Sequence, residues 1–455
     1  MLDFQKKLFQ EFKDKQLCVL GFDREGVSTF KILRQIFPNK IIGISDNQKK
    51  PINDKKASLH FGKDYLKSLK KYDVIFRTPG IPINLVKKFT KKNVIITSQT
   101  KLFFDLCQGS IIGVTGTKGK STTTTLIYKV LKIKFNNIFL IGNIGYPPLD
   151  YLKHIDKNSK IVFELSSHQL SDLQKSPHIA VFLNLFKEHM DYYSSFSQYI
   201  KAKESIIKFQ TKNDLLIFNT SDALVNKMAK ASQAKSISFS VKEKANIDCY
   251  FDKDAIYFKK EKFLSIKDSL LIGQFNLANI MPSIVIGRHF NIPKSNIIKA
   301  IKNFKPLNHR LEKVGKYSGI IFINDSLSTI PEATIAAINS LEGEIDSLII
   351  GGFDRGIDQT SVAKAIINSS IPVVILLPDT GKKIKNLIKK KINRKIKLIE
   401  AKSMNQAVKY AYENTNIGKI CLMSPAAASF NMFDSYQDRG NQFIKAIRRW
   451  GKINK

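Results

Sequence analysis

The chain has 455 residues, of which 43% are hydrophobic and 25% charged, and it carries a formal net charge of +36. This composition is typical of globular proteins and excludes a disordered chain, and the length predicts two or three domains. Its four cysteines are widely spaced without a CxxC pair, which excludes a disulfide framework and a zinc site and fits a reducing compartment such as the cytoplasm.

Neither a leader nor a membrane span is expected. The first residues, MLDFQKKLFQEFKDKQ, carry charges throughout, unlike a signal peptide. No uninterrupted run reaches the roughly 18 apolar residues that a membrane helix needs. The positive charge raises the alternative of a basic nucleic-acid-binding protein. However, the lysines are spread along the whole chain among isoleucine and asparagine, so we favour an enzyme with a lysine-biased surface and no nucleic-acid partner.

The first block, residues 1–108, alternates short apolar runs with polar turns. The runs predict strands at residues 16–22, 40–45, 73–80 and 93–98, and a helix is expected near residues 26–36. Strands that alternate with helices are typical of a parallel sheet in an α/β fold. We therefore predict a small Rossmann-like domain here.

The second block, residues 109–310, opens with IIGVTGTKGKSTTTT at residues 111–125. An apolar strand runs into a glycine-rich turn, and a helix is expected to start near Ser121. Such a turn lets backbone N–H groups converge on an anion, to which the helix N-terminus adds its positive dipole end. Lys120 can reach phosphate oxygens, and the Ser121 hydroxyl suits a Mg²⁺ position. Further strands are expected at residues 161–167 and 179–185, whereas residues 214–271 are expected to form short strands and turns.

The third block, residues 311–455, contains five apolar runs that each precede a helical pattern, which predicts a second Rossmann-like sheet. The runs are GIIFIND, SLIIGGFD, PVVILLPD, KIKLIEA and KICLMSP. The sequence thus predicts an α/β protein of three domains, in which the central one carries the phosphate loop and a small β part.

The phosphate loop departs from an ordinary Walker A motif, which would place its first glycine at the position of Val114. The form GTKGKSTTT resembles the loop of the Mur ligase superfamily, the ATP-dependent amide ligases of peptidoglycan precursors, which also includes folylpolyglutamate synthetases. Other segments resemble this family in the same order along the chain: FELSSHQL, LNLFKEHMDYY, YIKAKESI, GQFNLANI and NHRLEKV.

The resemblance implies roles for residues of the central block and its end. It implies catalytic or metal-site roles for Lys120, Ser121, Glu164, His189 and a lysine that becomes carbamylated, Lys203. It implies ATP contacts from the phosphate loop, the adenine-side segment and the region that follows it: Gly116, Thr117, Lys118, Gly119, Lys120, Ser121, Thr122, Asn276, Asn279, Arg310 and Asp325. The expected cofactors are ATP and Mg²⁺, with two ions.

The flanking blocks resemble the branch of the family that adds glutamate to UDP-N-acetylmuramoyl-L-alanine, through GFDREGVSTF, ISDN, RTPGIP, GNIG, GGFDRGID and SPAAASFNMFDSY. The substrate contacts that this implies are Ser45, Asp46, Thr78, Asn143, Ser328, Arg355, Ser429 and Tyr436. A cytoplasmic monomer is expected. The first block argues against folylpolyglutamate synthetase, which normally lacks such a UDP-binding domain.

The predicted amino-acid site departs from the usual pattern of this branch. Leu327 stands where a lysine is usual, Arg355 replaces a lysine that grips the carboxylate, and Tyr436 stands where phenylalanine is common. Arginine still binds a carboxylate, but with a different reach and geometry. D-glutamate is therefore the default expectation from the family, and L-glutamate, which a variant subgroup uses, remains the alternative.

Overall fold

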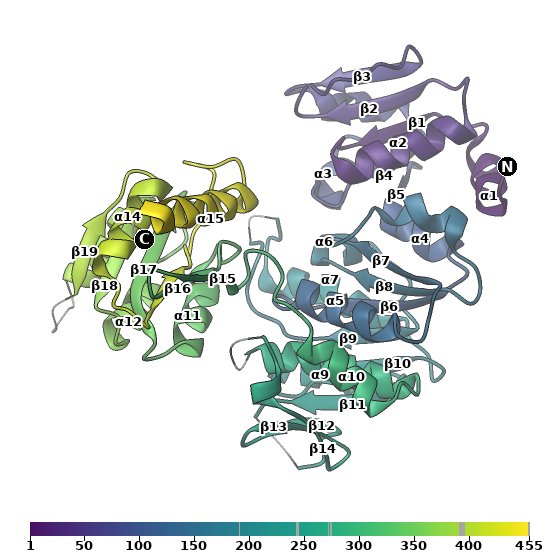
Figure 1. Ribbon diagram of the computed structural model, residues 1–455. Coiled ribbons are helices and arrows are strands. Elements are labelled where there is room, and N and C mark those ends of the chain that lie inside the picture. The colour runs from purple at the N-terminus through teal and green to yellow at the C-terminus, as the bar shows by residue number, and fades with distance from the viewer. Residues whose placement is uncertain (191, 243–244, 272, 274, 391–395, 454–455) are drawn as a thin grey trace. The chain divides into compact units, whose positions relative to one another are not determined.

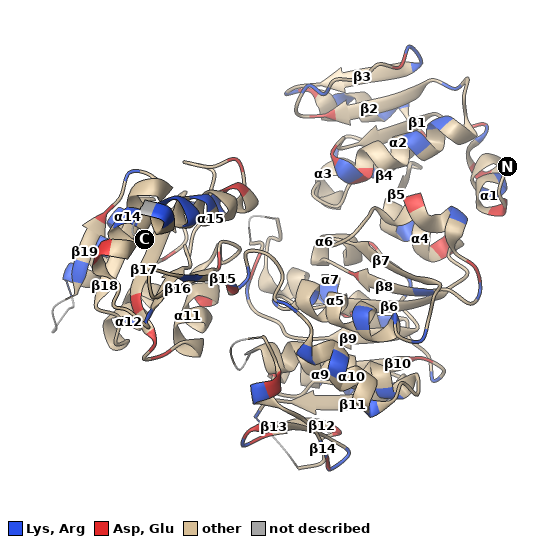
Figure 2. Ribbon diagram, viewed as in Figure 1, with Lys and Arg blue, Asp and Glu red and all other residues tan. Residues whose placement is uncertain are grey.

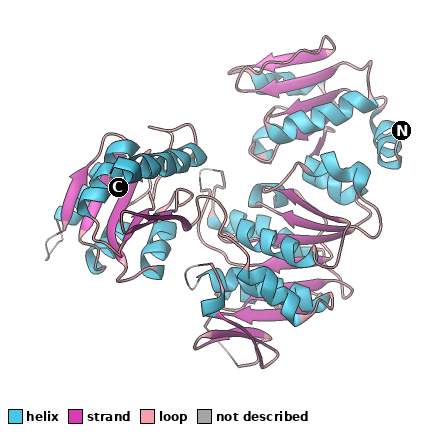
Figure 3. Ribbon diagram, in the orientation of Figure 1, coloured by secondary structure: helices cyan, strands magenta, loops and turns pink. Residues whose placement is uncertain are grey.

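The computed structural model describes residues 1–455 except 191, 243–244, 272, 274, 391–395 and 454–455 (Figure 1). Strands and helices alternate along the chain and build three sheets flanked by helices (Figure 3), which confirms the predicted α/β class. Contacts divide the chain into two compact units, residues 1–268 with 277–302, and residues 269–276 with 303–455. Each predicted block holds one sheet, and the exact domain bounds 1–108, 109–310 and 311–455 remain a prediction.

The first sheet has the order β3-β2-β1-β4-β5, and its neighbouring strands pair in parallel. Its strands are β1 (Leu17–Leu20), β2 (Ile42–Asp46), β3 (Ala57–Phe61), β4 (Val74–Arg77) and β5 (Ile95–Thr97). The helices are α1 (Asp3–Phe12), α2 (Arg24–Ile36), the 3₁₀ helix η1 (Tyr65–Lys71), α3 (Ile83–Lys87) and α4 (Gln99–Leu106). Four of these strands match the predicted runs, whereas β3 is an addition whose residues are only partly buried.

The second sheet has the order β14-β13-β12-β11-β10-β9-β6-β8-β7. Its strands are β6 (Ser110–Thr115), β7 (Ile138–Gly142), β8 (Lys160–Glu164), β9 (Ile179–Phe182), β10 (Leu215–Asn219), β11 (Lys235–Ser240), β12 (Cys249–Asp252), β13 (Ala255–Phe258) and β14 (Glu261–Ser265). The helices are α5 (Lys120–Leu131), η2 (Pro148–His154), α6 (Ser167–Leu170), α7 (Phe196–Lys208), α8 (Ala223–Ala229), η3 (Ile266–Asp268), α9 (Phe275–His289) and α10 (Lys294–Lys302).

The later part of this sheet corrects one expectation. Residues 214–271 begin with a further parallel unit, β10-α8-β11, before the antiparallel strands β12 to β14. Only those last strands fit the prediction of short strands and turns.

The third sheet has the order β15-β16-β20-β17-β18-β19. Its strands are β15 (Glu312–Tyr317), β16 (Ile320–Asn324), β17 (Ile345–Gly352), β18 (Val373–Asp379), β19 (Lys397–Glu400) and β20 (Ile420–Met423). The helices are α11 (Pro331–Ser340), α12 (Thr360–Asn368), α13 (Thr380–Lys389), α14 (Met404–Asn414) and α15 (Tyr436–Ile453). The five predicted strands pair in parallel, and β15 adds an antiparallel edge.

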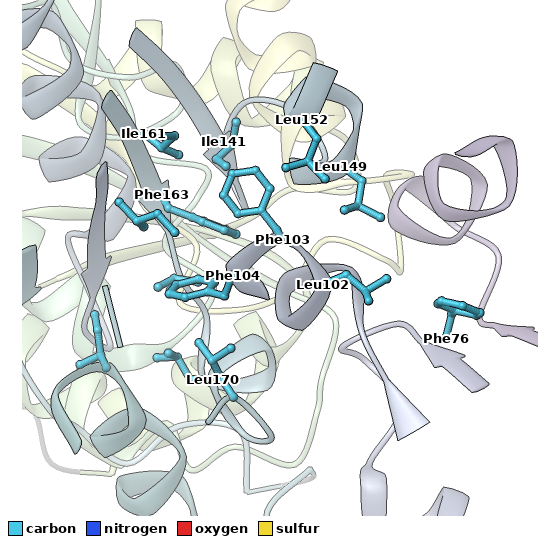
Figure 4. Close-up of a cluster of buried hydrophobic side chains, with 14 of the residues drawn as sticks. Phe76, Leu102, Phe103, Phe104, Ile141, Leu149, Leu152, Ile161, Phe163 and Leu170 are labelled. Atoms are coloured by element: carbon cyan, nitrogen blue, oxygen red, sulfur yellow. The ribbon is translucent and has the colours of Figure 1, made fainter. Parts of the chain in front are cut away.

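One hydrophobic core joins the first two sheets, so they form a single unit. Phe103 and Phe104 of α4 pack on Phe163 of β8, with ring centroids 5.6 Å and 5.9 Å apart, and further apolar side chains surround them (Figure 4). Helix α4 ends just before β6, the strand that leads into the phosphate loop. The packing of α4 against this core therefore also positions β6, the first strand of the second sheet.

Basic residues are distributed over the helices of both units (Figure 2). Among the described residues, no helix combines the length and apolar character needed to cross a membrane.

Candidate active site

The phosphate loop joins the end of β6 to the start of α5, as predicted. Gly119, directly before α5, has a φ of 87°, a left-handed conformation that glycine adopts without steric cost. A Cβ atom at this position would lie 2.0 Å from Oδ1 of Asn279 on α9. The first turn of α5 carries N–H groups that have no partner within the helix, and the helix dipole makes this end attractive to an anion.

Hydrogen bonds to neighbouring segments hold the phosphate loop in place. The N–H groups of Thr117 and Lys118 donate to the backbone O and the side-chain Oδ1 of Asn184, at 2.9 and 2.8 Å. The Thr117 hydroxyl lies 2.8 Å from the hydroxyl of Tyr199 on α7. Lys120 Nζ donates to the backbone O atoms of Gly116 and Thr117, each at 2.9 Å. The loop is thus a fixed cradle, and its lysine lies over the glycine-rich turn.

Glu188 is a residue of this site that the sequence interpretation did not select. Its carboxylate pairs with Lys118 Nζ at 2.6 Å. Burial alone would raise the pKa of Glu188, but the charge and hydrogen bond of Lys118 outweigh it, so the pKa is lowered and the carboxylate stays ionised. Its position could have indicated a role, because Glu188 directly precedes His189 in the segment LNLFKEHMDYY.

A buried carboxylate stands beside the helix N-terminus. Glu164 ends β8, is 2% exposed, and accepts a hydrogen bond of 3.2 Å from the Ser121 hydroxyl through Oε1. Its Oε2 is buried and accepts no hydrogen bond within the described part of the chain. Carboxylate and hydroxyl oxygens are ligands that Mg²⁺ prefers, so this pair fits such an ion. The described residues hold no cluster of three His, Cys, Asp or Glu side chains able to bind a metal, so most ligands of an ion here would be phosphate or water oxygens.

Lys203 is buried, although an amphipathic helix pattern alone would assign it to solvent. It is 1% exposed, and its Nζ donates to Thr115 Oγ1 at 3.2 Å and Gly116 O at 2.8 Å. Burial, reinforced by the positive charge of Lys120, lowers its pKa well below the ordinary value. A buried amine of this kind is held next to the phosphate loop in a readily neutralised form.

His189 lies on the loop after β9 with a φ of 59°, a left-handed conformation that few residues other than glycine adopt. Its ring centroid is 4.7 Å from that of His168 on α6. His168 is a second residue that the sequence interpretation passed over, although it lies within the quoted segment FELSSHQL.

A pocket of about 400 Å³ brings several predicted residues together. Thr78, Lys120, Asn143, His189 and Lys203 all line it. The remaining lining residues come from the start of α2, the loop after β4, the region of α6, and α7: Asp23, Arg24, Glu25, Pro79, Gly80, Ser166, Ser167, His168, Gln169 and Tyr199. The pocket therefore lies where the carboxyl ends of strands from the first and second sheets meet, the usual place for ligands in α/β folds.

A second cavity of about 390 Å³ lies on the first sheet and shares Asp23, Thr78 and Gly80 with the first. Asp46 lines it, and accepts hydrogen bonds from the N–H groups of Phe22 and Gln48 at 2.6 and 2.8 Å. Ser45 does not line it, because this side chain is buried and its hydroxyl donates to Tyr65 O at 2.7 Å.

The adenine-side asparagines fall in different units. Asn279 is 4% exposed and accepts a hydrogen bond of 3.4 Å from the Thr123 hydroxyl of α5, next to the loop. Asn276 belongs by its contacts to the second unit, where its N–H donates to Gly273 O at 3.0 Å.

In the second unit, Asp325 directly follows β16 and is 3% exposed. Its Oδ2 accepts hydrogen bonds from the hydroxyls of Ser328 and Ser424 at 2.6 and 2.8 Å, and its Oδ1 accepts one from Leu311 N at 3.2 Å. Burial raises the pKa of Asp325 to about 6, against the opposing effect of these bonds and of the neighbouring Arg310.

Of the other predicted residues of the second unit, Arg355 and Ser429 lie on the loops after β17 and β20, and Tyr436 begins α15. Arg439 of α15 is buried and joins loops: its guanidinium donates to the backbone O atoms of Ser326, Ala427 and Ala428 at 2.8 to 3.1 Å. Ser429 directly follows Ala428 and is 2% exposed. The backbone O of Tyr436 accepts a hydrogen bond from the Ser326 hydroxyl at 2.7 Å. Arg355 is exposed, with its guanidinium over the ring of Phe430.

These features define an α/β protein with a phosphate-binding loop at the carboxyl edge of a central sheet. Residues 114–287 match the Mur ligase middle domain. Over 97% of this chain and 99% of the relative, the sequence is 31% identical to a UDP-N-acetylmuramoylalanine–D-glutamate ligase of Clostridium tetani. A ligase of the same name from Acetivibrio thermocellus is 31% identical over 98% of both chains. The chain belongs to the Mur ligase family.

Solved structures agree with this fold. The chain is similar to the MurF ligase of Thermotoga maritima in complex with ADP, with a TM-score of 0.62 and 16% identity over 97% of both chains. It is also similar to the UDP-N-acetylmuramate–alanine ligase of Thermotoga maritima, with a TM-score of 0.60 and 16% identity over 96% of this chain and 100% of the other.

Proposed function

We propose that this protein is an ATP-dependent ligase that joins glutamate to the alanine carboxyl group of UDP-N-acetylmuramoyl-L-alanine in peptidoglycan precursor synthesis. The observation that carries the proposal is one pocket that adjoins both the phosphate loop with Lys120 and the loop of Thr78 on the first sheet. The relatives that align over nearly the whole chain bear the name of this reaction.

The chemistry follows from this arrangement. ATP, when bound, supplies the phosphoryl group that converts the alanine carboxylate into an acyl phosphate, and the glutamate amine then displaces phosphate. The N–H groups of residues 119–122, at the start of α5, would hold the phosphates, and Lys120 would offset their charge. Such transfers depend mainly on positioning and on neutralisation of phosphoryl charge. Asn143, whose N–H donates to Glu164 O at 3.2 Å, would orient the muramoyl substrate beside the buried carboxylate.

Mg²⁺ belongs to the proposal, with Ser121 and Glu164 as its protein ligands and His189 near a second ion. Bound Mg²⁺ would screen the phosphate charges and orient their oxygens. Lys203 would serve that second position as a carbamate, since its buried amine is readily neutralised. A carbamate replaces a cation by an anion, which reverses the charge facing the phosphates.

The resemblance assigns Asn276 and Asn279 to the adenine end of ATP, and it assigns Arg310 and Asp325 as further ATP contacts. The amino-acid site would use Ser328, Arg355 and Ser429 on loops of the second unit, with Tyr436 at the start of α15. The relatives are named for D-glutamate, which favours this enantiomer. L-glutamate stays the alternative because Leu327 removes one cation and Arg355 alters the carboxylate clamp. We expect a monomer that acts in the cytoplasm, where ATP and nucleotide-linked sugars are available.

The test is phosphate release by the purified protein with ATP, Mg²⁺, UDP-N-acetylmuramoyl-L-alanine and each glutamate enantiomer in turn. Release with D-glutamate is the expected result, and release with L-glutamate alone would establish the alternative. Release with neither would overturn the proposal. In Lys120→Ala, release should fall by about 100-fold or more, with an unchanged circular dichroism spectrum.

A further inference from the structure

An arginine is buried at the end of β4, directly before the loop that lines the first cavity. Arg77 is 1% exposed, and its Nη2 lies 3.0 Å from Oδ2 of Asp172, whose side chain is 9% exposed. Asp172 follows α6, so the pair joins the first sheet to the second within one compact unit. Removing two charges from water is costly, and apolar residues would fill the same space more cheaply.

The same guanidinium gathers the loop that follows β4. Arg77 Nη1 donates to the backbone O of Ile81 at 2.7 Å and to that of Pro79 at 3.2 Å. The hydroxyl of Tyr192, from the loop after β9, donates to Pro79 O at 3.0 Å. Both side chains therefore fix the carbonyl groups of Pro79 and Ile81 within the loop of residues 78–81.

The loop of residues 78–81 forms part of the surface of both cavities, because Thr78 and Gly80 line each of them. The partners of Arg77 come from the second sheet's part of the unit, close to residues that line the first cavity. Asp172 lies four residues after His168, and the Tyr192 ring centroid is 4.2 Å from that of His168. The N–H of Tyr192 also donates to His189 O at 3.0 Å.

We propose that Arg77 is a positioning residue that, through Asp172 and Tyr192, holds the loop of residues 78–81 at a fixed distance from the wall carrying His168 and His189. It thereby sets the affinity for the uridine-linked substrate. The planar guanidinium suits this task because its donors point in fixed directions, whereas a lysine would offer one flexible point charge. The inference rests on the proposed function, and it adds residues that have no expected contact with ATP or glutamate.

A purely structural role would give a different kinetic result. Loss of stability lowers the fraction of active protein and hence the apparent kcat, but leaves KM unchanged for every substrate. A displaced loop instead raises KM for the substrate that it contacts, and only for that substrate.

The experiment compares Asp172→Asn and Tyr192→Phe with the unaltered protein, measuring KM for UDP-N-acetylmuramoyl-L-alanine, ATP and glutamate. We expect Asp172→Asn to raise KM for the uridine-linked substrate about tenfold, and Tyr192→Phe about threefold, because small misplacements of positioning groups are costly. KM for ATP should stay within about twofold. The double variant should show less than the product of the two effects, because both act through the same loop.

Asp54→Asn is the matched control. It breaks the ion pair of Arg34 Nε with Asp54 Oδ2, at 2.8 Å. Both residues belong to the block of the first sheet, and neither lines either cavity. It should leave all three KM values unchanged. Tyr192→Phe loses only one hydroxyl and decides the question if Asp172→Asn fails to fold.

Unchanged KM for the uridine-linked substrate in the folded variants, or an equal rise for ATP, would overturn the inference while leaving the proposed function intact. Absence of turnover in the unaltered protein would instead overturn the proposed function, and the inference with it.

Discussion

The guanidinium carbon of Arg355 lies 5.5 Å from the centroid of the Phe430 ring. Phe430 in turn meets Phe353 edge-on, with centroids 6.3 Å apart. Arg355 and Phe353 follow β17, and Phe430 follows β20, so neighbouring strands bring them together. A cation over an aromatic face is attracted by the negative face of the ring, which gives an exposed guanidinium a preferred direction.

Phe430→Leu should therefore raise KM for glutamate by about two- to fivefold, which corresponds to the roughly 0.5–1 kcal/mol of an exposed cation–π contact. KM for ATP should stay the same. Phe430→Tyr keeps the ring face and serves as the control, with near-normal KM for glutamate. An unchanged KM in the leucine variant would mean that Arg355 does not depend on Phe430 for its position.

Gly119→Ala should weaken ATP binding, because the new Cβ atom would collide with Asn279 Oδ1 at 2.0 Å in a left-handed conformation. We expect KM for ATP to rise about tenfold, since either the loop or the Asn279 side chain, both expected ATP contacts, must move to relieve the contact. Gly62→Ala is the control: Gly62 has a φ of 84° but no neighbouring atom within 4 Å. Both variants should lose about 1–2 kcal/mol of stability from backbone strain, and only the first should lose ATP affinity. Equal KM values for ATP in the two variants would contradict the collision.

Lys203 should react with carbon dioxide, because burial lowers its pKa and the neutral amine is the form that attacks. The measurement is carbon NMR in ¹³C-labelled bicarbonate, where a carbamate signal is expected in the unaltered protein and not in Lys203→Ala. Lys201→Ala, on an exposed position of the same helix, should keep the signal. A spectrum without the signal in the unaltered protein would exclude the modification under those conditions.

Asp325 should make the stability of the second unit depend on pH. Its folded pKa of about 6 exceeds the unfolded value of about 3.9, so the fold favours the protonated form. The stabilisation is complete below about pH 4 and is lost as pH rises through 6, by about 3 kcal/mol in total. Arg439, whose own pKa burial lowers to about 10, stays charged over this window.

Urea unfolding between about pH 4 and 7 measures this effect. Because Asp325→Asn cannot ionise at this position, the stability difference between it and the unaltered protein should change by that amount across the window. Parallel stability curves for the two proteins would show that Asp325 does not titrate there.

Much of this fold was predictable because its signals are local. The central strands of the sheets are buried and show as continuous apolar runs. The phosphate loop has a glycine at the position that requires a left-handed conformation. Strands β3 and β15 were missed because their residues are mostly half-exposed and lack such a run.

The site was less accessible to sequence reasoning, since burial is a tertiary property. In YIKAKESI, Lys203 lies four residues after Tyr199 and three before Ile206, on the apolar face of the helix, whereas exposed Lys201 does not. The usual preference of lysine for solvent outweighed this spacing, and only the resemblance drew attention to Lys203. Arg77 shows the same limit. A charged residue at the end of a strand is ordinarily solvent-exposed, and only the arrival of Asp172 from another sheet explains its burial.

The shared core of the first two sheets has a consequence for how the chain folds during synthesis. Phe103 and Phe104 find their partner Phe163 some sixty residues later in the chain. Until β8 has left the ribosome, Phe103 and Phe104 of α4 therefore lack their aromatic partner, and the core shared with the first sheet is incomplete. A nascent chain halted after α4 would expose apolar surface of the kind that chaperones bind. It would reach the native fold only after the strands of the second sheet have been synthesised and have packed against α4.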